Sequence, residues 1–416
     1  MRGHVREGSA VLALFLAFPA SADPGDHIPV GDATFTPGLG LGMEYSTNAR
    51  HVETVDGDAG ATNFAVAPVF DLRLSRDDLE VGTKGAYTLR KYIGKDDLTL
   101  DQYDAFLLQA NVDAYKQQPF GIRANESLGM ENHPVDGDAA TPAFTKQFRN
   151  QVSAEIPMRP RAAFDASIGG RYYFDDYQTA AADPDGGIGH YNTRNMYGPI
   201  ASVEWRFLPR TMVAVDFSYD HASYVTPVFD AVEGVPARYF PDRDMVRVLG
   251  GLRGLVTDRL TVTLMAGYGM ADFDEDSIDG IDPAAAVDPS GMEHLLVDTS
   301  LRYSLSDDDG IVVGFQRDFR DSFFTNYVAF MKGHVSADAR LTDRVGLLGE
   351  ISLASEQFRG QETRDDSVFV SRGEATYFFR DWASITAGVA YQQRWSSNAA
   401  VTYSEILGRL MMNATY

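Results

Sequence analysis

The chain contains no cysteine among its 416 residues. This absence excludes disulfide bonds, thiolate metal sites and a cysteine nucleophile. It also excludes a lipoprotein, because the lipid of such a protein is carried by a cysteine. The cellular compartment stays open on this ground alone, since an exported protein can fold without disulfides.

Long apolar runs are also missing. The apolar run at residues 10–18 is much shorter than the roughly 20 residues that a membrane-spanning helix needs. It follows Arg2 and Arg6 and precedes Ala20-Ser21-Ala22, which is the pattern of a secretory signal peptide. We therefore predict a signal peptide over residues 1–22 and a single outer-membrane β-barrel domain over residues 23–416.

The parts of an enzyme or of a nucleic-acid-binding protein are not found. No Gly-x-Ser-x-Gly elbow occurs, and the neighbours Asp220-His221 have no nucleophile or second acid that the sequence can place beside them. The Asp-rich stretches 272–280 and 183–186 do not match a calcium-binding EF-hand loop. A net charge of −23 argues against nucleic acid as a partner. We predict no catalysis, no cofactor and no metal site.

What the chain does have is a period of two in its apolar residues. In the tail, Ile406, Leu410, Met412 and the final Tyr416 share one face, and the other face is mixed. One consistently apolar face beside a mixed, charged face predicts strands that meet lipid on one side only. We therefore expect an all-β fold, a transmembrane antiparallel up-and-down β-barrel in which no strand edge stays free.

We predict about eighteen strands, an even number as single-chain bacterial barrels have. They span residues 33–46, 62–75, 78–92, 99–115, 119–131, 143–157, 161–175, 191–207, 210–222, 243–256, 259–272, 292–305, 310–320, 324–338, 343–356, 367–379, 382–396 and 400–416. Short turns with Arg, Asp or Pro alternate with longer loops rich in Asp and Gly. This alternation predicts periplasmic turns, extracellular loops and both termini on the periplasmic side of the bacterial outer membrane. We expect contact with outer-membrane lipid and lipopolysaccharide, and recognition by the barrel assembly machinery through the C-terminal strand ending at Tyr416.

Charged residues of both signs are predicted on the inner face. Charges at membrane depth must pair or reach water, so they either hold the wall as cross-strand ion pairs or line a hydrated path. The candidates for a solute path are Arg73, Lys84, Arg90, Arg171, Arg247, Arg253, Arg302, Arg394 and Arg409. Inward Tyr173 and His221 could stack on sugar rings, although packing at the rim is the simpler role.

Residues 314–327 form the most distinctive segment, a predicted hairpin with a very short outer loop. We expect its charges to pair across the hairpin and its aromatic residues to anchor the tip in the outer interface. The charges are Arg317, Asp318, Arg320 and Asp321, and the aromatic residues are Phe319, Phe323, Phe324 and Tyr327. The segment resembles a hairpin of the "putative β-barrel porin 2" family, some members of which accompany exopolysaccharide export systems. The resemblance implies a barrel through which, or beside which, a polysaccharide leaves the cell, with a periplasmic polysaccharide-export protein as the expected partner.

Three functions follow from these patterns. A polysaccharide export conduit needs a wide lumen without an inward-folded constriction, and the long loops show no clear constriction pattern. A diffusion porin for small polar solutes usually has an inward-folded segment. A plugged structural barrel would fill its bore with aromatic residues and ion pairs. An energy-coupled receptor is disfavoured, because we see no plug domain before the first strand and expect fewer than its 22 strands.

Overall fold

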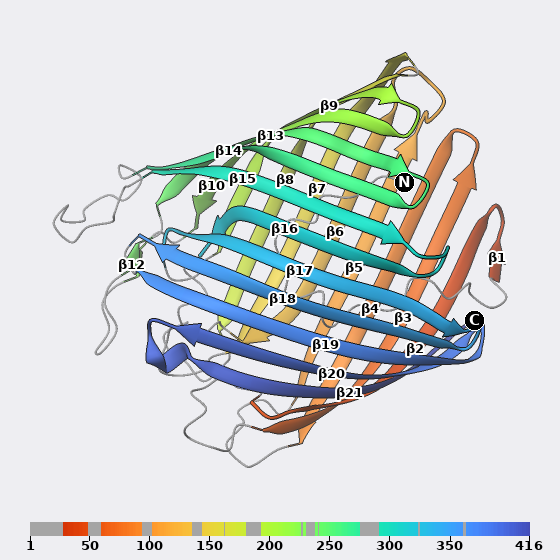
Figure 1. The fold of residues 1–416 in the computed structure, drawn as a ribbon, viewed down its shortest axis with the longest axis vertical. Coiled ribbons are helices and arrows are strands. Elements are labelled where there is room, and N and C mark those ends of the chain that lie inside the picture. The colour runs from red at the N-terminus through yellow and green to blue at the C-terminus, as the bar shows by residue number, and fades with distance from the viewer. Residues whose placement is uncertain are drawn as a thin grey trace.

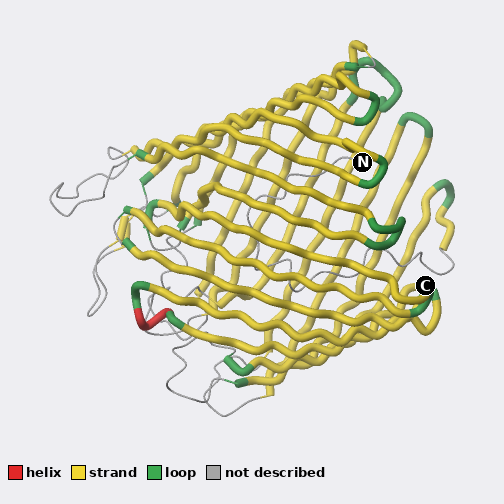
Figure 2. The backbone as a smooth tube through the Cα atoms, viewed as in Figure 1, coloured by secondary structure: helices red, strands yellow, loops and turns green. Residues whose placement is uncertain are grey.

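The computed structural model confirms a closed antiparallel barrel of 18 strands (Figures 1 and 2). It describes residues 28–48, 60–93, 102–134, 144–161, 163–179, 193–225, 228–229, 238–239, 241–274, 291–322, 325–360 and 363–416. The predicted signal peptide, the acidic loops 183–186 and 275–280, and Phe323 and Phe324 therefore lie outside the described residues. Among the described residues, no helix has the length and apolar character needed to cross a membrane.

The wall follows the order of the chain. Its strands are β2 (Ala33–Ser46), β3 (Ala61–Arg76), β4 (Leu79–Ile93), β5 (Gln102–Ala114), β6 (Ile122–Pro134), β7 (Phe144–Arg161), β8 (Phe164–Thr179), β9 (Arg194–Leu208), β10 (Thr211–Tyr224), β13 (Asp242–Thr257), β14 (Leu260–Asp274), β15 (Met292–Ser304), β16 (Gly310–Asp321), β17 (Tyr327–Thr342), β18 (Val345–Arg359), β19 (Arg364–Arg380), β20 (Ala383–Ser396) and β21 (Tyr403–Thr415). Each predicted strand overlaps one of these. The first and last strands pair from Gly38↔Thr415 to Ser46↔Leu407 and close the barrel.

Small elements decorate the two ends. β1 (Ile28–Val30) folds back on β2, β11 (Val228–Phe229) pairs with β12 (Arg238–Tyr239), and a 3-10 helix, η5 (Ala399–Val401), precedes β21. We call the end with the short turns and the C-terminus the turn end, and the opposite end the loop end (Figure 1). At the turn end, Thr257 accepts hydrogen bonds from the backbone N–H groups of Arg259 and Leu260. This side-chain turn explains why the Thr-Asp-Arg sequence reverses the chain there.

The outward face carries the predicted apolar belt. Leu39, Leu41, Met43 and Tyr45 on β2 are exposed, as are alternate residues of the other strands. Exposed aromatic residues stand near both ends of the strands, as in the interfacial girdles of membrane barrels. Those near the loop end include Tyr45, Tyr197 and Trp395, and those near the turn end include Trp205, Tyr303, Trp382 and Tyr416.

One seam departs from this regular ladder. β15 and β16 pair only from Ser304↔Gly310 to Val297↔Arg317, although β15 begins at Met292 and β16 runs on to Asp321. The end of β16 stays paired with β17 as far as Asp321↔Tyr327. Toward the loop end, β16 therefore leaves the wall and carries its hairpin into the barrel (Figure 1).

Candidate functional site

The candidate site is the loop end of the lumen, where the end of β16 lies against the inner face of β13, β14 and β15. Phe319 is 1% exposed and packs in an apolar cluster with residues of those three strands. The other buried members are Met245, Ala271, Phe273, Met292 and Leu296, with Leu249 and Tyr327 packed beside them. Gly269 makes the approach possible, because a Cβ there would lie 2.5 Å from the Phe319 ring.

This arrangement corrects two expectations: that the aromatic residues of the hairpin anchor its tip in the outer interface, and that an inward-folded element would be one of the long loops. Phe319 and Tyr327 do not anchor its tip in the outer interface. Tyr327 stacks on Phe273, with ring centroids 6.2 Å apart, and Phe273 is buried in the apolar cluster with Phe319. The inward-folded element is thus this short hairpin, while the prediction looked for a constriction only among the long loops.

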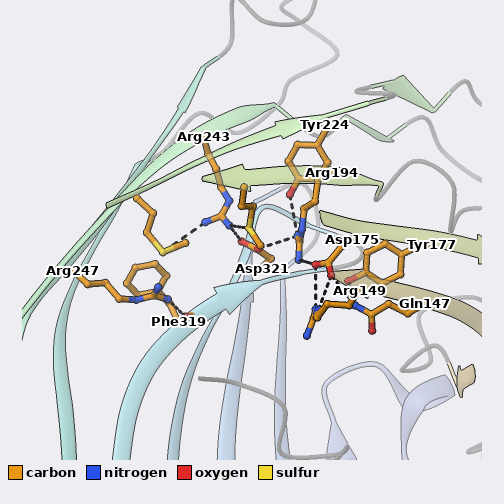
Figure 3. Close-up of polar contacts among 12 residues, drawn as sticks. Gln147, Arg149, Asp175, Tyr177, Arg194, Tyr224, Arg243, Arg247, Phe319 and Asp321 are labelled. Atoms are coloured by element: carbon orange, nitrogen blue, oxygen red, sulfur yellow. Dashed lines mark hydrogen bonds and ion pairs between the residues drawn. The ribbon is translucent and has the colours of Figure 1, made fainter. Parts of the chain in front are cut away.

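The charges of the hairpin do not pair across it either. Asp321 binds Arg194 of β9, with Nη1 and Oδ2 2.9 Å apart, and also Arg243 of β13 (Figure 3). Four strands separate β9 from β16 along the wall, and adjacent strands are spaced by about 4.8 Å. Asp321 can reach Arg194 only because the end of β16 folds over the inner face of β13 to β15 toward β9.

A second carboxylate continues this contact along the wall. Asp175 of β8 is fully buried and accepts hydrogen bonds from Arg149 at 2.6 Å and from Arg194 at 3.2 Å (Figure 3). Gln147 donates to Asp175 and to the Tyr177 hydroxyl. Buried charges are tolerated only when they are paired in this way.

Arg247 fastens the middle of the hairpin. Its Nη2 donates to the Phe319 carbonyl at 2.7 Å, its Nε lies 3.4 Å from Asp318, and its guanidinium stands 4.4 Å from the centre of the Phe319 ring. Arginine suits this place because it combines a charge with a flat face that stacks on an aromatic ring.

On its other side the hairpin contacts β18 through Arg320, and Glu356 connects this contact to β20, which in turn is bound to β19. Arg320 donates to Glu356 at 2.7 Å, and Arg394 binds Asp366 at 2.6 Å and Glu356 at 3.4 Å. Arg364, which stacks on Phe358, lies 3.1 Å from Asp366. Arg317 makes no ion pair within the described part of the chain. The hairpin therefore bridges two regions of the wall.

We call these residues the arginine network. Its members are Arg149, Arg194, Arg243, Arg247, Arg320, Arg364 and Arg394, with the carboxylates Asp175, Asp318, Asp321, Glu356 and Asp366. Among the described residues it holds seven cations and five anions. This local excess of positive charge stands in a chain whose net charge is −23.

The other predicted lumen residues also lie on the inner face. Three of them reach a carboxylate two strands away: Arg171 binds Asp220, Arg302 binds Asp338 and Arg409 binds Glu374. Arg253 binds Asp216 of the adjacent strand β10. Arg409 passes over Gly388, where a Cβ would lie 3.2 Å from both side chains. These contacts are the wall-holding ion pairs that the sequence suggested.

Three predicted residues belong to a less crowded wall. Arg73 donates two hydrogen bonds to the carboxylate of Asp71 on the same strand, from Nε at 3.0 Å and from Nη2 at 2.6 Å, and Lys84 Nζ lies 3.8 Å from Asp71. Arg90 lines a small inner pocket with Glu44 and Arg409. The prediction for His221 was wrong: it shares the outward face with Val215 and Phe217 and bonds Asp244 at 2.8 Å.

Sequence reasoning missed most of the arginine network. Arg149, Asp175, Arg194, Arg243, Glu356, Arg364 and Asp366 were not among the predicted inward charges. The period of two could have identified them, because residues an even number of positions apart on a strand share a face. Asp175 follows Arg171 and Tyr173 in steps of two, and Arg243 precedes Arg247 by four. Extending the inward face to the strand ends would have found them.

Comparisons with known proteins agree with this architecture. The structure is similar to a BenF-like porin from Pseudomonas fluorescens, with a TM-score of 0.50, 11% identity, and coverage of 92% of this chain and 98% of that one. It is also similar to OpdL from Pseudomonas aeruginosa, with a TM-score of 0.47, 11% identity, and coverage of 93% and 99%. The FrpB iron transporter from Neisseria meningitidis gives a TM-score of 0.49 at 9% identity; the match covers 86% of this chain and 62% of FrpB.

At these identities the structural matches concern the fold alone. The sequence gives no match among curated proteins. The family comparison does give one, because the description "putative β-barrel porin 2" matches residues 25–416, nearly the whole chain. The chain therefore belongs to the putative β-barrel porin 2 family of outer-membrane barrels, as the hairpin resemblance implied.

Proposed function

We propose that this barrel is a porin-like channel for small polar solutes that carry negative charge. The observation that carries the proposal is the arginine network, which surrounds an inward-folded hairpin with more cations than anions. A narrow part of a pore lined by one sign of charge concentrates solutes of the opposite sign. Arginine forks also match the planar geometry of a carboxylate.

The hairpin favours this function over an open export conduit. A wide conduit needs an unobstructed lumen, whereas the end of β16 folds into the loop end of this one and covers the inner face of β13 to β15. Export of a polysaccharide, predicted from the family resemblance, is a second candidate. It is supported by the same resemblance and would need the hairpin to move aside, with a periplasmic export protein as partner.

Bilayer recording of the refolded protein separates the candidates. For an anion channel we expect a modest single-channel conductance and, in a KCl gradient, a reversal potential that favours Cl⁻ over K⁺. A cation-favouring reversal potential would contradict the proposal. A large conductance blocked by polysaccharide fragments would favour export, and no conductance at all would favour a plugged structural barrel.

A further inference from the structure

The interrupted pairing between β15 and β16 allows two alternative positions for the end of β16. Met292–Leu296 of β15 have no β16 partner, because pairing stops at Val297↔Arg317. Continuing that register by one residue at a time would set Leu296 opposite Asp318, Leu295 opposite Phe319 and His294 opposite Arg320. Unpaired backbone groups at a membrane wall are unfavourable, so completing this ladder offers a real alternative to the inward position.

The sequence of β16 fits the completed ladder. Phe319 has the same parity as Ile311, Val313 and Phe315, which are exposed on the lipid face. In the completed ladder Phe319 would stand beside Leu295, which is also exposed on that face. In the structure the Phe319 side chain, although at a position of lipid-facing parity, packs instead on the inner face of β13 to β15. One segment thus has two compatible packings, one that closes the wall and one that narrows the lumen.

Asp321 holds the inward packing through arginines. Its carboxylate lies between Arg194 and Arg243, whose side chains are 8% and 3% exposed. The Nε atoms of Arg194 and Arg243 are buried and have no hydrogen-bond acceptor among the described residues. The buried Nε of Arg247 makes only its 3.4 Å ion-pair contact with Asp318 and no hydrogen bond there. These guanidinium groups therefore present more donors than Asp321 uses. A cluster of arginines with spare buried donors is suited to a carboxylate ligand.

We propose that Arg194, Arg243 and Arg247 form a binding site for a solute carboxylate, and that Asp321 occupies this site when no solute is bound. A bound solute displaces Asp321, and the released end of β16 pairs with β15 and widens the lumen. This inference rests on the proposed function, since it takes the anionic solute as its ligand. It adds that the solute opens its own path.

Cysteine pairs can test the movement, because the chain has no cysteine of its own. The double variant Leu295→Cys/Phe319→Cys places thiols at positions that become neighbours only in the completed ladder. D-glucuronate is the carboxylate probe, and D-glucose is its uncharged match. We expect the disulfide to form about tenfold faster with glucuronate, a typical size for coupled binding and conformational change, and to be unaffected by glucose.

The matched control is Leu301→Cys/Val313→Cys, a pair already in register on the same two strands. Its disulfide should form equally fast with either sugar. If the control pair closes while the Leu295/Phe319 pair stays open, or closes at one rate under all conditions, the proposed movement is wrong. Heat-dependent electrophoretic mobility shows that each variant is a folded barrel.

Asp321→Asn gives a second measurement that leaves Phe319 in place. We expect its conductance without glucuronate to match that of the parent protein with glucuronate, and added glucuronate to change it little. Asp338→Asn, which removes the partner of Arg302 near the turn end, should keep the glucuronate response. An Asp321→Asn channel that still responds like the parent would overturn the displacement.

The two proposals fail separately. The reversal potential decides whether the channel favours anions, without regard to the hairpin. The cysteine pair decides whether the hairpin moves, without regard to ion current. A channel that favours Cl⁻ but shows no glucuronate-dependent disulfide would keep the proposed function and exclude the displacement.

Discussion

The two sides of this barrel use the same residue types in different ways. The inner face of β2 to β5 is lined by small residues such as Gly42 and Ala65. Its charged residues Arg73 and Lys84 are solvated, with side chains 62% and 53% exposed. Across the lumen, the hairpin covers the inner wall at the loop end. There Arg243 is 3% exposed and Asp175 is fully buried.

The difference shows that an inward-facing charged side chain is solvated or buried according to whether the hairpin covers the wall at that point. An arginine on the bare wall stays in water and contributes little to stability. Beneath the hairpin, the same side chain becomes a buried partner whose loss would strand a carboxylate. We therefore expect solutes to pass between the hairpin with its arginine network and the β2 to β5 side, and the buried ion pairs to position and hold the hairpin.

The largest effect is expected for Arg194→Met. This change leaves Asp175 with one arginine fewer and removes one of the two arginines on Asp321, so we expect a loss of about 3–5 kcal/mol in the free energy of unfolding. Urea unfolding in detergent micelles measures it. Arg73→Met on the bare wall is the matched control and should stay within about 0.5 kcal/mol of the parent. Equal losses in the two variants would remove the distinction between the walls.

Phe319→Ala comes next. Removing a buried ring usually costs about 3–5 kcal/mol, and the low end applies here because the hairpin can settle into the space. Weaker packing of the hairpin should also raise the mean single-channel conductance. Phe315→Ala, which truncates an exposed ring on the lipid face of the same strand, should leave the conductance unchanged. A Phe319→Ala channel with the parent conductance would argue that the hairpin does not narrow the lumen.

Gly269→Ala sharpens the comparison through a single methyl group. Its Cβ would lie 2.5 Å from the Phe319 ring and 3.0 Å from Leu296, so we expect overpacking to cost about 1–3 kcal/mol. The same change at Gly42 on the bare wall meets its nearest neighbour, Met411, at 3.5 Å, which is an ordinary contact. Gly42→Ala should therefore have no measurable cost, and urea unfolding of both variants checks this.

The smallest effect is expected for Lys84→Gln. The side chain is half exposed and lies 3.8 Å from Asp71, so stability should change by less than about 0.5 kcal/mol. Because we place the solute path on this wall, the reversal potential should move slightly toward K⁺. A reversal potential identical to that of the parent would argue that the path runs elsewhere.

Much of this fold could be predicted from the sequence. A period of two, punctuated by turn residues, locates strands whatever lies around them, and lipid on one side makes the outward face easy to read. Inward ion pairs were predictable in kind, since unpaired charges are too costly at membrane depth. His221 was predicted to face inward because it is polar, although its position in the period of two places it on the outer face. There it is hydrogen-bonded to Asp244.

The inward hairpin could not be read in the same way. Local patterns place Phe319 on the lipid face, and only contacts with distant strands reverse this. Arg247 and Phe319, which are hydrogen-bonded, are 72 positions apart, and Arg194 lies far earlier in the chain than Asp321. The sequence periodicity does not indicate that the apolar cluster on β13 to β15 binds an aromatic ring from β16. The only local sign is Gly269, whose missing side chain leaves room for that ring.

The most direct test of the account is a crosslink between β14 and β17. Phe273→Cys/Tyr327→Cys replaces two rings whose centroids are 6.2 Å apart in the structure. On a barrel with a complete wall, β15 and β16 would separate these strands. We predict that a short thiol-specific crosslinker joins the pair as readily as Thr376→Cys/Thr386→Cys, whose native hydroxyls are 2.9 Å apart. If only the control pair reacts, the hairpin does not lie inside the barrel.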